Sequence, residues 1–63
     1  MSKFIEDALK HANPKIKDGT WPRNFNRRKY VSDLIRNIQD SKLVNSLLIE
    51  LSKLDDEELA KVI

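Results

Sequence analysis

The residues best suited to binding another molecule are concentrated in one stretch of ten positions, residues 21–30. This stretch holds three of the chain's four aromatic residues and four of its twelve lysines and arginines. Aromatic rings interleaved with guanidinium and ammonium groups favour an anionic or a stacking partner. The sequence therefore predicts a binding surface in this stretch, formed by Trp21, Arg23, Phe25, Arg27, Arg28 and Lys29.

Three consecutive cations, Arg27, Arg28 and Lys29, fall in or beside the first turn of a predicted helix. Positive charge at this end opposes the helix macrodipole and costs about 0.3–1 kcal/mol per residue at low salt. Combined with the free N–H groups of the first turn, the same charge creates a site that attracts anions. The alternative is structural: Lys29 and Arg36 would pair with Asp33, and Arg27 would lie along the apolar face with its charged end in water.

The three aromatic residues of the stretch also have two interpretations. Trp21, Phe25 and Tyr30 have ring faces on which nucleic-acid bases can stack. In a small helical protein, however, such rings more often cover the core, because each buries a large area. Tyr30 is in phase with the apolar residues of its helix, so we expect Trp21 and Tyr30 to anchor the core or the loop. Phe25 lies off that apolar stripe and is the better candidate for an exposed contact.

The sequence lacks the residue patterns that catalysis requires. There is no cysteine and a single histidine, and no glycine-rich phosphate loop or metal-ligand spacing is found. The acidic residues at positions 55–58 are explained by the start of a helix, where they complement the macrodipole. We therefore expect a non-enzymatic protein without a metal or a cofactor.

The length of 63 residues allows a single domain, residues 1–63. A chain of this size buries only about 60% of its unfolded surface, and its core rarely supplies more than about 3–5 kcal/mol. Disulfides are excluded without cysteine. We therefore expect a homodimer, or a partner that orders the chain, and the wide apolar arc of the third predicted helix offers Leu47, Ile49 and Leu51 as the dimer face.

Hydropathy indicates the cellular location of the protein. No apolar run approaches the roughly 20 residues that a membrane crossing needs, and the start of the chain has no apolar signal region. A cytoplasmic protein without membrane contact is therefore expected.

Residues 14–30 carry six basic side chains and one acid, whereas residues 40–63 carry three basic side chains and six acids. The chain is basic in its middle and acidic towards its end.

Apolar residues at helical spacing predict an all-α fold of three main helices and a short C-terminal helix. The first helix covers residues 3–12, with Ser2 as its N-cap, and is expected to end before Pro14 because the residue preceding a proline avoids the α region. Both prolines and the only glycine lie within an irregular loop over residues 13–24, where a hairpin is not expected.

The remaining helices are predicted from caps and apolar stripes. The second runs from about 25 to 39 after Asn24 or Asn26, and the third over 42–53 after Asp40 or Ser41. Asp55 and Glu58 have capping-box spacing and start the fourth. The expected core comprises Phe4, Ile5, Leu9, Val31, Leu34, Ile35, Ile38, Leu43, Leu47, Leu48, Leu51, Leu54 and Leu59.

Two functional hypotheses remain from the sequence. The first is a small regulatory protein that uses residues 21–30 and an apolar helix face to bind an acidic surface of a protein partner. The second is a nucleic-acid-binding protein that uses the same basic stretch. The acidic end of the chain favours the first, because phosphate-binding domains of this size tend to be basic throughout. The length and helical character are similar to those of small phage- and plasmid-encoded regulators, but no motif identifies a family.

Overall fold

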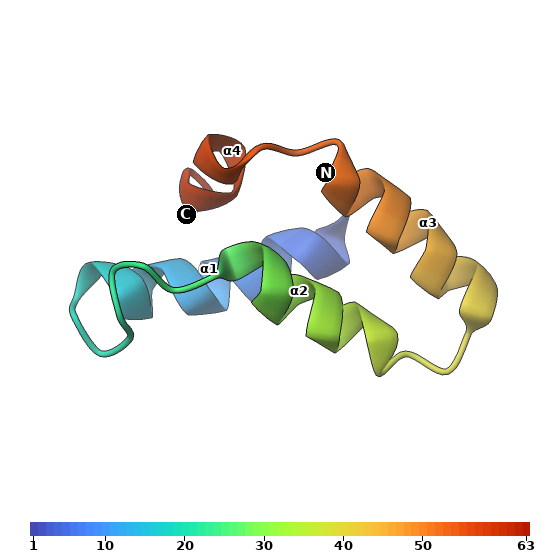
Figure 1. The fold of residues 1–63 in the computed structure, drawn as a ribbon, viewed down its shortest axis with the longest axis horizontal. Coiled ribbons are helices and arrows are strands. Elements are labelled where there is room, and N and C mark those ends of the chain that lie inside the picture. Colours follow the sequence, from blue (N-terminus) through green and yellow to red (C-terminus); the bar gives the residue numbers. More distant parts are fainter.

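Helices make up two thirds of the chain in the computed structural model, which describes all residues 1–63 (Figure 1). The helices are α1 (Lys3–Lys17), α2 (Arg27–Arg36), α3 (Ser41–Ser52) and α4 (Asp56–Ala60), and the fold has no strand. This confirms the predicted all-α class with three main helices and a short C-terminal one.

Each helix begins at a cap residue whose side chain accepts a hydrogen bond from a backbone N–H of the first turn. At the start of α4 the bonds are reciprocal, since Glu58 also accepts from the backbone N–H of Asp55. Every cap lies among the residues that the sequence predicts for it. The four caps, in chain order, are Ser2, Asn26, Asp40 and Asp55.

The first helix passes through Pro14 and ends at Lys17, so its predicted end at residue 12 is wrong. Proline has no backbone N–H and leaves the carbonyl of Lys10 without its helical partner. Lys10 and Pro14 both lie on the exposed side of α1, where water can bind that carbonyl. The additional turn buries Ile16, which is only 6% exposed, and this burial favours continuation of the helix.

The loop between α1 and α2 is consequently shorter than predicted and covers residues 18–26. It turns at Gly19, whose φ of +88° lies in the left-handed region that glycine adopts without strain. Hydrogen bonds from the side chain and the backbone N–H of Thr20 hold the pKa of Asp18 below its ordinary value. These contacts make the turn at the end of α1 a defined structure.

The second helix is also shorter than predicted, since it ends at Arg36 with Asn37 as its C-cap. The backbone N–H of Ile38 still bonds to the carbonyl of Ile35, and the chain then reverses towards Asp40. This early end allows α3 to fold back against α2 (Figure 1).

The core is built around α2, which contacts α1, α3 and α4. The buried apolar side chains of the core come from all four helices, and five of those in the core cluster are fully buried. The core cluster consists of Ile5, Ala8, Leu9, Val31, Ile35, Leu47, Leu51 and Leu59.

The other predicted core residues divide into two groups. Four of them, Leu34, Ile38, Leu48 and Leu54, are partly buried and pack against the cluster. The prediction is wrong for Phe4 and Leu43, which are 38% and 45% exposed. Both lie in the first turn of a helix, where the neighbouring helices cover only part of the side chain.

The start of α1 is attached to α3 by a single polar contact. The backbone N–H of Ser2 donates to a carboxylate oxygen of Glu50 at 2.9 Å. This hydrogen bond lowers the pKa of Glu50, because it stabilises the ionised carboxylate. The contact holds the N-cap of α1 in place beside the third helix.

Candidate partner-binding surface

Three aromatic rings from the loop and the start of α2 form one cluster. The ring centroids of Trp21 and Phe25 are 4.7 Å apart, those of Trp21 and Tyr30 are 5.4 Å apart, and those of Phe25 and Tyr30 are 5.6 Å apart. The ring of His11 on α1 packs edge-to-face with that of Trp21, at a centroid distance of 5.9 Å. We call the rings of Trp21, Phe25 and Tyr30 the aromatic cluster. All three remain partly exposed.

Backbone hydrogen bonds fix the loop that carries this cluster. The N–H of Trp21 donates to the carbonyl of Lys15 at 3.0 Å, which attaches the loop to the last turn of α1. The N–H of Phe25 donates to the carbonyl of Pro22 at 3.1 Å and closes a turn directly before α2. The loop is therefore attached to α1 and closed by a turn at its far end, which positions the rings of Trp21 and Phe25.

Phe25 has the same burial class as Trp21 and Tyr30. The sequence predicts Phe25 as the exposed aromatic and predicts that Trp21 and Tyr30 anchor the core or the loop. Instead Phe25 is partly buried and contacts both of the other rings. Tyr30 packs against the core, as its phase predicts. Each of the three rings therefore contacts the other two, and Phe25 is not a separate exposed contact.

The guanidinium of Arg28 makes hydrogen bonds and an ion pair within the fold. It donates to the carbonyl of Leu51 at 2.9 Å and to that of Leu54 at 2.6 Å. It also contacts a carboxylate oxygen of Asp56 at 3.2 Å. Arg28 thus gives the carbonyl of Leu54 a donor and the carbonyl of Leu51 a second donor beside the N–H of Leu54, and it connects α2 to the segment between α3 and α4. Its main contacts are structural.

Arg27 is held by a residue that the sequence did not indicate as functional. Its Nε donates to the side-chain oxygen of Asn13, which is only 8% exposed. The amide nitrogen of Asn13 donates to the carbonyls of Leu59 at 2.9 Å and Val62 at 2.7 Å. The sequence predicts Asn13 in the loop that follows the first helix. Its helical spacing to Leu9 would have placed it on the buried face if α1 had been extended past Pro14.

The remaining predicted cations face solvent. Arg23 is exposed and makes neither a hydrogen bond nor an ion pair with the rest of the chain. Lys29 pairs with Asp33 at 3.0 Å on the outer face of α2, and Arg36 approaches the same carboxylate at 3.9 Å. Both pairs match the structural alternative described for this helix. Such exposed pairs are worth little energy and break easily when a partner arrives.

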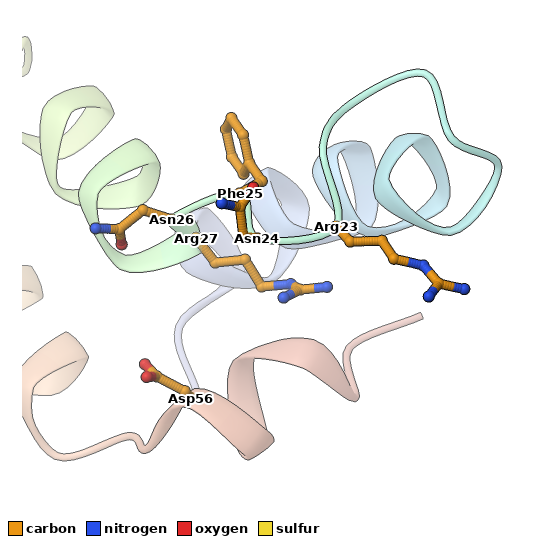
Figure 2. Close-up of a pocket in the computed structure, with 6 residues that line it drawn as sticks. All are labelled: Arg23, Asn24, Phe25, Asn26, Arg27 and Asp56. Carbon is orange, nitrogen blue, oxygen red and sulfur yellow. The ribbon is translucent and has the colours of Figure 1, made fainter.

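A polar hollow of about 360 Å³ opens beside this loop (Figure 2). In the close-up the side chains of Arg23 and Arg27 extend over α4, and Asp56 reaches up from α4 on the opposite side. The hollow therefore combines two cations with one carboxylate. Its lining consists of Arg23, Asn24, Phe25, Asn26, Arg27 and Asp56.

The residues predicted as a dimer face have different environments. Leu47 and Leu51 belong to the core cluster and are 5% and 3% exposed. Ile49 points away from them and is 57% exposed. Of the three side chains, only Ile49 is available to another chain in this structure.

Comparisons with protein-family models, with curated proteins and with solved structures found no match to this chain. No group of three or more His, Asp or Glu side chains comes together in a way that could hold a metal ion. None of the four helices combines the length and the hydropathy that crossing a bilayer demands. The function is therefore inferred from the surface itself.

Proposed function

We propose that this chain is a small non-enzymatic interaction protein that binds an acidic surface of a protein partner in the cytoplasm. The contact surface is the aromatic cluster together with Arg23. The observation that carries this proposal is the state of Arg23, which is exposed and unpaired in the same loop that carries the partly exposed rings of Trp21 and Phe25. Aromatic residues and arginine are enriched in the residues that dominate binding energy at protein interfaces.

The charges around this surface favour a protein over nucleic acid. The guanidinium of Arg28 is engaged by internal hydrogen bonds, which leaves one cation fewer free to contact phosphates. Asp56 lines the same hollow as Arg23, and the other acids of the first turn of α4 follow it in the chain. A nucleic-acid backbone lying across this face would meet these carboxylates at close range, and like charges repel. A protein partner can place its acids selectively on Arg23.

Reversing the charge of Arg23 tests the proposal. We expect Arg23→Glu to abolish capture of the partner from a native extract of the source cells, while wild-type protein retains it after nuclease treatment. The charge reversal removes an attractive contact and places a carboxylate against the acidic partner. Arg23 is exposed and makes no hydrogen bond or ion pair within the chain, so circular dichroism of the variant should be unchanged.

Lys42→Glu is the matched control, because Lys42 is an exposed cation at the start of α3, away from the aromatic cluster. Nuclease-resistant capture that survives Arg23→Glu but is lost with Lys42→Glu would contradict the proposal. Capture lost after nuclease would instead support nucleic acid as the ligand. Anisotropy titrations with random duplex DNA and single-stranded RNA would then show salt-dependent binding, with a slope near −0.9 per phosphate contact on duplex DNA.

We also propose that the chain forms a homodimer, because its core is small for an independent domain. Ile49 is the exposed residue of the predicted face, so Ile49→Ser should shift the protein towards monomer. Gel filtration coupled to light scattering measures the mass directly. A monomeric wild-type protein with a sharp melting transition that does not depend on concentration would contradict this proposal.

A further inference from the structure

A second hollow, of about 570 Å³, lies on the other side of Arg27. It runs between the last turns of α1, at Pro14 and Ile16, and the residues that follow α4, at Val62 and Ile63. Apolar side chains from these two segments face each other across it. We call this hollow the apolar groove. It is separate from the aromatic cluster, which contributes no residue to it.

The cations at the edge of the apolar groove differ in whether they are paired. Lys61 is held by Glu57 at 3.1 Å. Lys17 and Arg27 have no acidic group within ion-pair distance in the chain. Two positive charges without an acidic partner therefore lie beside the apolar groove, and this combination is complementary to a ligand that carries both an apolar side chain and an acid.

Arg27 is preorganised for such an acid. Its Nε is fixed by Asn13, which is itself held by two backbone carbonyls. The two Nη groups of Arg27 make no hydrogen bond within the chain. The free edge of a guanidinium matches a carboxylate in two parallel hydrogen bonds, and a guanidinium that is already positioned loses less entropy when it binds one. Arg27 also lines the polar hollow, so it lies between the two surfaces.

We infer that the apolar groove binds an extended acidic peptide segment of the partner. An apolar side chain of that segment enters between Ile16 and Val62, and a neighbouring carboxylate binds the Nη groups of Arg27 with Lys17 beside it. This inference rests on the proposed function, since it adds a second contact for the same acidic partner. It gives that partner a recognisable local sequence, in which an apolar residue is next to an aspartate or glutamate.

The test uses a short fluorescein-labelled peptide of alternating leucine and glutamate, titrated against the full chain by fluorescence anisotropy. Two matched peptides replace either every glutamate by glutamine or every leucine by serine. We expect saturable binding of the first peptide and a loss of about tenfold or more in affinity with each of the other two, because a charge-assisted hydrogen bond and a buried apolar side chain are each worth about this factor.

Variants of the groove locate the contact. Lys17→Gln should weaken binding severalfold, and Ile63→Ser should do the same, whereas Lys42→Gln should bind like the wild type. These three side chains are exposed, so the substitutions leave the core intact. Arg27→Gln should have the largest effect, about tenfold or more. Since Arg27 also contacts Asn13, its variant is compared only after its melting temperature is shown to be unchanged.

Amide chemical shifts separate the failure of this inference from the failure of the proposed function. Shifts confined to Ile16, Lys17 and residues 60–63 on addition of the peptide support the groove. Shifts at the indole N–H of Trp21 without changes in the groove would overturn the inference and leave the proposed function standing. No saturable binding, or equal binding of a lipid vesicle or a second copy of the chain at the groove, would also overturn it. Loss of partner capture with Arg23→Glu is measured independently.

Discussion

Replacing Arg28 by alanine is expected to lower the free energy of unfolding by about 2–4 kcal/mol. The substitution removes the donor to the carbonyl of Leu54 and one of two donors to the carbonyl of Leu51, which keeps the N–H of Leu54, and each hydrogen bond to a charged group is worth about 1.5–3 kcal/mol. The ion pair with Asp56 adds little, because that carboxylate is 90% exposed. For a chain of this size the loss corresponds to a fall in Tm of roughly 10–20 °C, which thermal unfolding followed by circular dichroism would measure.

Two controls accompany this substitution. Arg36→Ala removes an exposed arginine from the same helix and should change the unfolding free energy by less than about 0.5 kcal/mol. Arg28→Lys keeps the charge but cannot span two carbonyls with a planar fork, so it should recover only part of the loss. Equal stability of Arg28→Ala and Arg36→Ala would show that the contacts to the end of α3 contribute nothing.

Replacing Asn13 by leucine is expected to cost about 2–4 kcal/mol, although the new side chain is apolar and similar in size. The carbonyls of Leu59 and Val62 would lose their only side-chain donor, and Arg27 would lose the acceptor that holds its Nε. Urea unfolding should show a lower midpoint for this variant. Amide exchange in residues 59–62 should accelerate more than in α3, because α4 loses its attachment to α1.

Asn45→Leu is the control for Asn13→Leu, because Asn45 is exposed and makes no side-chain hydrogen bond. A double-mutant cycle of Asn13→Leu with Arg27→Gln separates the two roles of the amide. Coupling above about 0.5 kcal/mol is expected, since the two side chains are in direct contact. A neutral effect of Asn13→Leu would show that water replaces the amide fully.

The features that the sequence predicted correctly are those determined by local contacts. The caps at Ser2, Asn26, Asp40 and Asp55 were predictable because each side chain bonds to a backbone N–H a few residues away. The core of the helices followed from apolar spacing in the same way. Such features need no knowledge of how the helices pack.

The end of α1 was not predictable from local rules, because tertiary contacts decide it. The preference of residue 13 to leave the α region before Pro14 is overcome by the burial of Ile16 and by the bonds that Asn13 makes to residues far along the chain. Arg28 illustrates the same limit for the candidate site. Nothing near it in the sequence shows that its guanidinium reaches the end of α3, more than twenty residues away.

The position of α2 among the other three helices has a consequence for folding. Since α2 contacts α1, α3 and α4, no consecutive pair of helices encloses a core without the rest. The buried face of α2, with Val31 and Ile35, stays partly exposed to solvent until α1, α3 and α4 have all packed against it. We therefore expect no part of the chain to fold on its own, and we expect the whole chain to unfold in a single cooperative transition.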